Sequence, residues 1–126
     1  MEKLIKEARL AQNNSYAPYS KYRVGAAILT EDNTIISGCN VESSSYGLTC
    51  CAERVAIYSA IAQGHNRFRA LAIFTENGGT PCGACRQVIW DICGDIPIYI
   101  ANENDNVEET TSKDLLPDAF DGSMLK

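Results

Sequence analysis

Four residues of this 126-residue chain have the types and the spacing of a catalytic metal site. Cys51 and Glu53 belong to a Cys-Ala-Glu tripeptide, and Cys82 and Cys85 belong to the run Pro-Cys-Gly-Ala-Cys. Three thiolates occupy three corners of a tetrahedral zinc ion and leave the fourth corner open to water. A carboxylate two residues from the first ligand can move the proton of that water. The spacing therefore predicts a zinc site that is open and catalytic.

The next residue along the chain, Arg54, bears on the charge of this site. Three thiolates outweigh the charge of one Zn²⁺, and the excess negative charge weakens the ion as an acid toward its water. An arginine that donates hydrogen bonds to the ligand sulfurs offsets the excess. We therefore expect Arg54 beside the ligands, the alternative being a cation at the surface.

The cysteines by themselves leave other interpretations open. A Cys-x-x-Cys pair at a helix start is also typical of thiol oxidoreductases, and three cysteines occur in structural zinc sites or as buried thiols. A closed structural site needs a fourth ligand, and the only histidine, His65, follows a glycine at the far end of its predicted helix. We expect His65 to be a solvated loop residue. The other three cysteines have no ligand spacing and are expected to be buried small side chains.

The elements that must position these residues are predicted by hydrophobic periodicity and turn residues. Helices are expected from residue 4 up to the Asn13-Asn14 pair, over 51–63 and over 81–92. Strands are expected over 22–29 and 34–39, as a hairpin, and over 70–74, 96–101 and 107–111, followed by a helical turn at 112–116. The four residues of the metal site then fall in the first turns of the second and third helices.

Strands that alternate with helices predict right-handed crossover connections and an α/β fold. We expect a single domain over residues 1–126, built as a three-layer α/β/α sandwich around a mixed, mostly parallel five-stranded sheet. Ligands of such sheets bind at the carboxyl ends of the strands, where the helices begin. The two cysteine-bearing helix starts are therefore expected side by side, and their partial positive charge favours thiolates.

Composition and charge exclude several classes of protein. A net charge of -5 and a pI of about 4.8 argue against a nucleic-acid partner, because such binding relies on Lys and Arg replacing counterions. The apolar runs are too short to span a membrane, and the N-terminal residues lack the apolar segment of a signal peptide. We therefore expect a cytoplasmic protein with no membrane partner and a small neutral or cationic substrate.

Cys-Ala-Glu-Arg at 51–54, followed by Pro-Cys-Gly-Ala-Cys-Arg-Gln at 81–87, resembles the small zinc-dependent cytidine deaminases that act on free nucleosides. Segments over nearly the whole chain also resemble family segments in family order, namely 16–27, 38–42, 45–49 and 115–120. The resemblance implies a cytidine deaminase-like fold and hydrolysis of cytidine and 2'-deoxycytidine to uridine and 2'-deoxyuridine with release of ammonia, in pyrimidine salvage. It also implies one zinc ion per subunit and a homotetramer.

The same resemblance implies roles at the reaction centre. Cys51, Cys82 and Cys85 hold the zinc ion. Glu53 takes a proton from the attacking water, delivers it to N3 of cytosine, and then protonates the departing amino group.

Other positions match the substrate-binding residues of the family. Asn40 and Glu42 match the pair that binds the ribose 3'-hydroxyl. Tyr22 stands where many members have a phenylalanine packed against the pyrimidine, and its additional hydroxyl needs a partner or water. The Ala52 N–H and the Thr80 carbonyl are expected to meet the O2 atom and the exocyclic amine of the base.

Two aromatic residues, Tyr46 and Phe120, match residues that reach the active site of a neighbouring subunit. For both, a place in the core of the same subunit is the alternative. For the activity, the alternative within the family is a deaminase of a related cytosine nucleoside such as blasticidin S. Outside the family, the alternatives are a thiol oxidoreductase and a non-catalytic zinc-binding protein, and neither explains Glu53.

Overall fold

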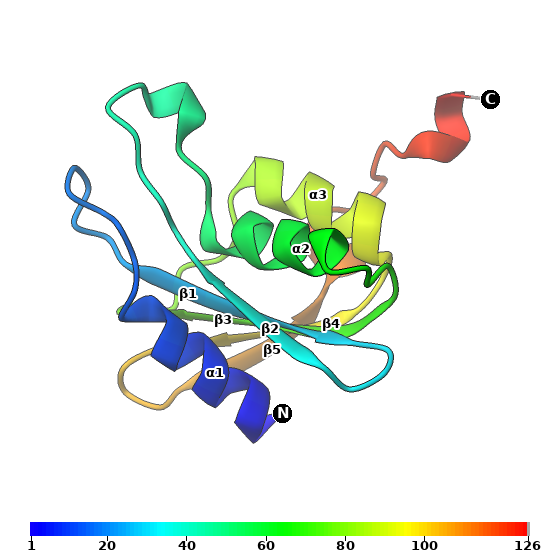
Figure 1. The fold of residues 1–126 in the computed structure, drawn as a ribbon. Coiled ribbons are helices and arrows are strands. Elements are labelled where there is room, and N and C mark those ends of the chain that lie inside the picture. The colour runs from blue at the N-terminus through cyan, green and yellow to red at the C-terminus, as the bar shows by residue number, and fades with distance from the viewer. Residues whose placement is uncertain (126) are drawn as a thin grey trace.

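A five-stranded sheet with helices on both faces makes up the computed structural model, which describes residues 1–125 (Figure 1). The elements are α1 (Glu2–Gln12), β1 (Val24–Thr30), β2 (Ile35–Cys39), α2 (Ala52–Ala62), β3 (Phe68–Thr75), α3 (Gly83–Cys93), β4 (Pro97–Ala101), β5 (Val107–Thr111) and α4 (Ser112–Leu115), with 3-10 turns at Tyr46–Leu48 and Gly122–Leu125. No helix in this part of the chain has the length and apolar character needed to cross a membrane.

The strands lie in the order β2-β1-β3-β4-β5. The predicted mixed five-stranded sheet is confirmed, but the expectation that it is mostly parallel is wrong. Only β3 and β4 pair in parallel, whereas β1 pairs antiparallel with both β2 and β3, and β4 pairs antiparallel with β5. The reason is that the crossover through α2 passes over β1. Strands β2 and β3 run in the same direction, but the first strand of the hairpin lies between them.

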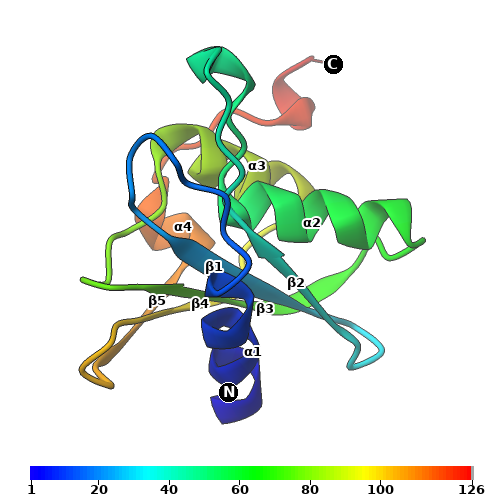
Figure 2. The same ribbon diagram turned by 60° about the vertical axis from the view of Figure 1, so that its left-hand side comes forward.

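Helices cover both faces of this sheet, as the two views show (Figures 1 and 2). On one face, Leu4 and Ala8 of α1 belong to an apolar cluster that includes Phe74 of β3. On the other face, Ile57 of α2 and Ile89 of α3 belong to a second cluster. Because both faces are covered, β1 and β3 are apolar along nearly their whole length. This is the three-layer arrangement that the sequence predicts.

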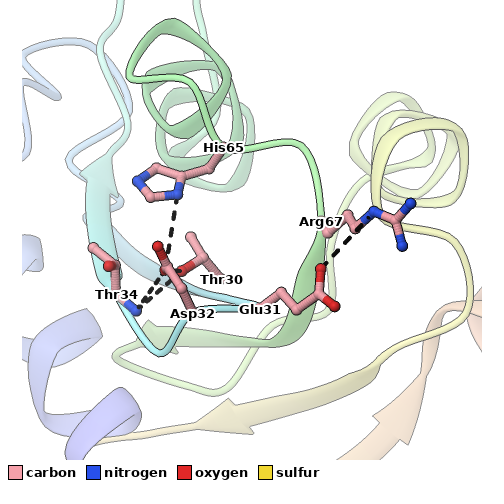
Figure 3. Close-up of polar contacts among 6 residues, drawn as sticks. All are labelled: Thr30, Glu31, Asp32, Thr34, His65 and Arg67. Atoms are coloured by element: carbon pink, nitrogen blue, oxygen red, sulfur yellow. Dashed lines mark hydrogen bonds and ion pairs between the residues drawn. The ribbon is translucent and has the colours of Figure 1, made fainter.

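The turn between β1 and β2 is held by polar contacts with the loop that follows α2 (Figure 3). His65 Nδ1 lies 3.9 Å from Asp32 Oδ1, and Arg67 Nε lies 3.9 Å from Glu31 Oε2. Asp32 also accepts a hydrogen bond from the Thr30 hydroxyl. Only 23% of the His65 side chain is exposed, so this residue is half-buried. The expectation of a solvated loop residue is therefore wrong.

Helix α2 lies close to the sheet because β2 has a glycine beneath it. A Cβ atom at Gly38 would lie 2.5 Å from the Ala56 nitrogen and 2.8 Å from the Ala52 oxygen, which are both backbone atoms. Helix backbone cannot turn aside as the end of a flexible side chain can. The position of α2, and of the residues at its start, therefore requires glycine at this position.

Gly38→Ala is expected to displace α2 and to lower the free energy of unfolding by about 1–3 kcal/mol, the usual cost of overpacking. Zinc content should fall as well, because Cys51, one of the predicted zinc ligands, directly precedes α2. Urea unfolding and metal analysis measure the two effects. Gly122→Ala is the matched control, since a Cβ atom there meets nothing within 4 Å. Equal stability of the two variants would contradict this account of the packing.

Candidate active site

Three cysteine side chains meet where α2 and α3 begin. Cys51 is the N-cap residue of α2, Cys82 is the N-cap residue of α3, and Cys85 lies in the first turn of α3. Their Sγ atoms all lie within 4.8 Å of one another. Cys51 and Cys82 were expected inside the first turns, but each stands one position earlier, because its extended backbone brings the incoming loop to the helix. The two helix starts are side by side, as the fold class predicts.

The surroundings of the sulfur atoms favour a thiolate at Cys51. Hydrogen bonds with the Cys85 thiol and the Arg54 guanidinium lower the pKa of Cys51 to about 5, although burial acts in the opposite direction. The same interaction with Cys51, together with burial, raises the pKa of Cys85. Cys82 Sγ accepts a hydrogen bond from the Cys85 N–H at 3.5 Å, as an N-cap side chain does for its helix. Negative charge at this cluster is also favoured by the two helix N-termini.

The cluster fits a zinc ion. With zinc–sulfur bonds of about 2.3 Å, two ligands of a tetrahedral ion lie roughly 3.8 Å apart, and Cys51 Sγ lies 3.8 Å from Cys82 Sγ. Within residues 1–125 this is the only such group of potential ligands, and it contains three residues. His65 follows the other end of α2, about 16 Å along the helix axis, so it does not complete a closed site. Three ligands with one open position are typical of a catalytic zinc site.

Arg54 lies beside the sulfur cluster. Its Nη2 donates a hydrogen bond to Cys51 Sγ at 3.6 Å, and this bond holds the pKa of the guanidinium above its ordinary value. The Nε of the same guanidinium is buried without a hydrogen-bond partner among the described residues. The Arg54 side chain therefore presents its positive charge to the cysteine cluster, which is where an excess of negative charge needs to be offset.

Glu53, in the first turn of α2, is buried with only 4% of its surface exposed. Its removal from water raises the pKa of this carboxyl group to about 7, and the negative charge of Cys51 acts in the same direction. A carboxyl group that titrates near neutral pH can both accept a proton and return it within one reaction.

A cavity of about 270 Å³ opens next to Glu53 and the cysteines. Most of the residues that the sequence singles out line it, namely Tyr22, Asn40, Glu42, Cys51, Ala52, Glu53, Thr80 and Cys82. The sheet contributes Val24 and Ile73 to the wall of the cavity, and these apolar side chains suit the faces of a ring. Cys85 is fully buried and does not line the cavity.

Asn40 is almost fully buried, and its amide group joins three segments of the chain. Its Oδ1 accepts hydrogen bonds from the Val24 N–H at 3.0 Å and from the Ser15 hydroxyl, and its Nδ2 donates to the Tyr22 carbonyl at 2.8 Å. One N–H of the amide is left for a ligand in the cavity.

Glu42 is fixed in a similar way. Its Oε1 accepts hydrogen bonds from the N–H groups of Tyr19 and Ser20, both at 3.0 Å, and its Oε2 accepts one from the Ser20 hydroxyl. These bonds, led by the Ser20 hydroxyl, lower the pKa of Glu42, so the group is an anion with acceptor capacity to spare.

Tyr46 and Phe120 lie at the surface, with 76% and 55% of their areas exposed, so the alternative that places them in the core is wrong. Neither residue lines the cavity next to the cysteines. The Tyr46 ring centroid lies 6.2 Å from that of Tyr19, and the Phe120 carbonyl accepts a hydrogen bond from Gln87 at 2.7 Å. The turn around Tyr46 and the C-terminal segment both extend beyond the layer of α2 and α3, on the side away from the sheet (Figures 1 and 2).

Arg86 is a functional candidate that sequence reasoning missed. Its Nε donates to the Pro81 carbonyl at 2.7 Å, its Nη2 to the Thr80 hydroxyl at 3.0 Å, and its Nη1 to the Leu115 carbonyl at 2.9 Å. One side chain thus joins α3 to the loop that carries Thr80 and to the C-terminal segment. Its place directly after Cys85 in the metal motif was the available signal.

The family model for the cytidine and deoxycytidylate deaminase zinc-binding region matches residues 1–100. A cytidine deaminase of Sporosarcina psychrophila is 50% identical over 123 residues, which cover 95% of this chain and 90% of that protein. The 1.6 Å crystal structure of cytidine deaminase from Burkholderia pseudomallei matches with a TM-score of 0.91 and 45% identity, covering 94% of this chain and 98% of that one. This chain belongs to the cytidine deaminase family.

Membership of this family makes the chain a zinc-dependent enzyme, and the cysteine cluster is a group of residues that could hold its zinc ion. A blasticidin-S deaminase of Bacillus cereus is also similar, with 32% identity over 108 residues that cover 78% of this chain and 76% of that protein. That identity is well below the 50% shared with the cytidine deaminase of Sporosarcina psychrophila.

The raised pKa of Glu53 predicts how stability depends on pH. The ordinary pKa of a glutamate is 4.5, and the pKa of Glu53 in the folded protein is about 7. Between these two pH values the folded protein binds more protons at this group than the unfolded chain, so stability falls as pH rises. Glu53→Gln removes this loss and should raise the free energy of unfolding at pH 8 by up to about 3 kcal/mol, with little gain at pH 5. Three thiolates and one Zn²⁺ sum to a negative charge, so bound zinc leaves the sign unchanged.

Urea unfolding of the zinc-loaded protein at the two pH values measures the difference. Glu108→Gln is the control, because Glu108 is exposed in β5. A gain for Glu53→Gln that is the same at pH 5 and pH 8 would show that the carboxyl group titrates normally.

Proposed function

We propose that this chain hydrolyses cytidine and 2'-deoxycytidine to uridine and 2'-deoxyuridine, with release of ammonia. The observation that carries the proposal is the buried carboxyl group of Glu53 beside three cysteines, at a cavity whose volume of about 270 Å³ is near the lower end for ligand pockets. When held by Cys51, Cys82 and Cys85, zinc would act as a Lewis acid and lower the pKa of a water molecule.

Glu53 moves the protons of the reaction. It accepts a proton from the attacking water and delivers it to N3 of the cytosine ring, then takes the second proton from the hydroxyl now on C4 and passes it to the amino group, which departs as ammonia as the C4 carbonyl forms. Both acceptance and donation are accessible because burial brings the pKa of Glu53 to about 7. Arg54 supports the thiolate form of Cys51 through its hydrogen bond.

Asn40 and Glu42 bind the sugar. The free N–H of Asn40 can donate to a hydroxyl oxygen, and the remaining lone pairs of Glu42 can accept the hydrogen of the same hydroxyl. This is the pattern that a ribose 3'-hydroxyl needs. Because ribose and 2'-deoxyribose both carry that hydroxyl, this pair binds either sugar.

The base lies between groups from three segments. Ala52 is the first residue of α2, so its N–H has no partner within the helix and can donate to O2 of the base. The Thr80 carbonyl accepts from the exocyclic amine. The ring of Tyr22, which lines the same cavity, packs against the pyrimidine.

We further propose that four copies of this single-domain chain assemble and that Tyr46 and Phe120 complete the active site of a neighbouring copy. Both rings are exposed and lie outside the cavity of their own chain. The segment that carries Phe120 is held on α3, since the Trp90 indole N–H donates to Asp121 Oδ2 at 3.2 Å. An exposed aromatic ring on a segment held in this way suits contact with a second subunit.

The proposed setting is pyrimidine salvage in the cytoplasm. All six cysteines are unpaired, which suits a reducing compartment. The net charge of -5 disfavours nucleic acid as a substrate, and we expect free nucleosides to be used. Blasticidin S is the second candidate substrate, and the lower identity to the deaminase of that compound favours cytidine.

Turnover of cytidine, followed as loss of cytosine absorbance and release of ammonia, tests the reaction. Glu53→Gln should retain zinc and fold but lose activity by about a hundredfold or more, because an amide cannot shuttle protons. Glu108→Gln serves again as the control, and blasticidin S and a cytosine-containing oligonucleotide are assayed in parallel. An active, zinc-loaded Glu53→Gln enzyme would remove Glu53 from catalysis, and preference for either alternative substrate would refute the proposed specificity.

Phe120→Ala tests the shared site. If the ring covers the base in a neighbouring subunit, its loss should raise the KM for cytidine about tenfold or more, since a buried aromatic contact is lost, while zinc content stays the same. Tyr58→Phe is a control that changes an exposed aromatic residue of α2. Sedimentation at the assay concentration measures the oligomeric state. A fully active monomer would refute the shared site and leave the chemistry at Glu53 untouched.

A further inference from the structure

Tyr22 stands where many members of the family have a phenylalanine, and in the structure its additional hydroxyl group has a specific partner. The Tyr22 hydroxyl donates a hydrogen bond to Asn77 Oδ1 at 2.7 Å. Tyr22 lines the same cavity as Glu53, whereas Asn77 does not. The bond therefore runs from a residue in the substrate cavity to a residue outside it.

The backbone of Tyr22 is already fixed by groups on the sugar side of the cavity. Its N–H donates to the Ser20 hydroxyl at 3.0 Å, and its carbonyl accepts from Asn40 Nδ2 at 2.8 Å. The freedom that remains lies in the rotation of the side chain. A bond at the far end of the ring removes that freedom.

Asn77 is itself held by the loop between β3 and α3. Its Oδ1 also accepts the Gly79 N–H at 3.2 Å, and the hydroxyl of buried Thr75 accepts the N–H groups of Gly78 at 2.7 Å and of Gly79 at 3.0 Å. The acceptor for the Tyr22 hydroxyl is thus part of an ordered turn that leads directly into Thr80.

The absence of a side chain at Gly79 leaves room for the same hydroxyl. A Cβ atom at Gly79 would lie 2.5 Å from the Tyr22 hydroxyl oxygen but 3.7 Å from the ring carbon that carries it. The first distance is a clash and the second is an ordinary contact. With tyrosine at position 22, a side chain at position 79 would therefore displace the hydroxyl from its place, whereas with phenylalanine at position 22 it would meet only an ordinary contact.

We propose that Asn77 is a positioning residue, which holds the Tyr22 ring against the nucleoside base and fixes it relative to the Thr80 carbonyl. The inference rests on the proposed function of the cavity. The ring meets one face of the base and the carbonyl meets its edge, and the bond from Tyr22 to Asn77 joins the two segments that carry them. Substrate then finds both contacts in place, so the ordering cost on binding is lower.

Steady-state kinetics with cytidine test the proposal on the zinc-loaded enzyme. Tyr22→Phe and Asn77→Ala should each raise KM about three- to tenfold, the size expected for one lost hydrogen bond, with a much smaller change in kcat. The double variant should be no worse than the singles, because both remove the same bond. Asn77→Asp keeps the acceptor oxygen and should restore KM. Unchanged KM in either single variant, or additive effects in the double variant, would overturn the proposal.

Gly79→Ala provides a second, independent test of the proposal. In the Tyr22 enzyme the added methyl group should push the hydroxyl away from Asn77 and raise KM, whereas in the Tyr22→Phe enzyme the same change should have little further effect. Tyr58→Phe, Asn66→Ala and Gly122→Ala are matched controls for the three types of substitution, at exposed positions away from the cavity. An equal effect of Gly79→Ala in both backgrounds would refute the fit between Gly79 and the hydroxyl.

Failure of the proposed function is separable from failure of this inference. If the parent protein does not turn over cytidine, the function is refuted, and crystal structures of the parent and of Asn77→Ala then decide the inference. The Tyr22 ring should occupy one position in the parent and move or take several positions in the variant. An unmoved ring in Asn77→Ala would overturn the positioning role.

Discussion

The start of α2 and the start of α3 lie at the same edge of the sheet, and the active site depends on that arrangement. Strands β2 and β3 run in the same direction although β1 separates them, so the helices that follow both begin at their carboxyl ends. Gly38 allows α2 to lie against β2 without a side chain between them. The N-cap positions of both helices then bring Cys51 and Cys82 to a sulfur–sulfur distance of 3.8 Å. Glu53 follows two residues later, on the buried side of the same helix start.

Charge is the main cost of this arrangement, since thiolates and a carboxyl group share one buried corner. Two helix N-termini and Arg54 offset part of the negative charge. Removal from water, together with the remaining negative charge at Cys51, raises the pKa of Glu53 to about 7. The same repulsion and burial that destabilise the ionised carboxylate make it a competent proton carrier near neutral pH. The local loss of stability and the chemical competence therefore have one physical origin.

The elements and the cysteine cluster were predictable because both are encoded locally. Helix periodicity, the glycine after α2 and the cysteine spacing gave the three layers and the sulfur cluster within a residue or two. The strand order was not predictable in the same way, since periodicity shows that a crossover exists but not that β1 lies between β2 and β3. Hydrogen bonds between distant segments were also out of reach. The bonds of Asn40 to Ser15 and of Tyr22 to Asn77 join residues 25 and 55 positions apart.

These distant bonds have a consequence for how substrate recognition is divided among residues. Asn40 and Glu42 each hold neighbouring loops through three hydrogen bonds, and each keeps some capacity for a ligand. The loops are thereby ordered before substrate enters, and the entropy of ordering them does not weaken binding. One amide group supports the Tyr22 backbone, and in the proposed function it also binds the sugar, so the positions of sugar and base would be linked through Asn40. In the proposed function, specificity therefore depends on connected hydrogen bonds, and a change at Asn40 is expected to alter the wall around the base as well as the contact with the sugar.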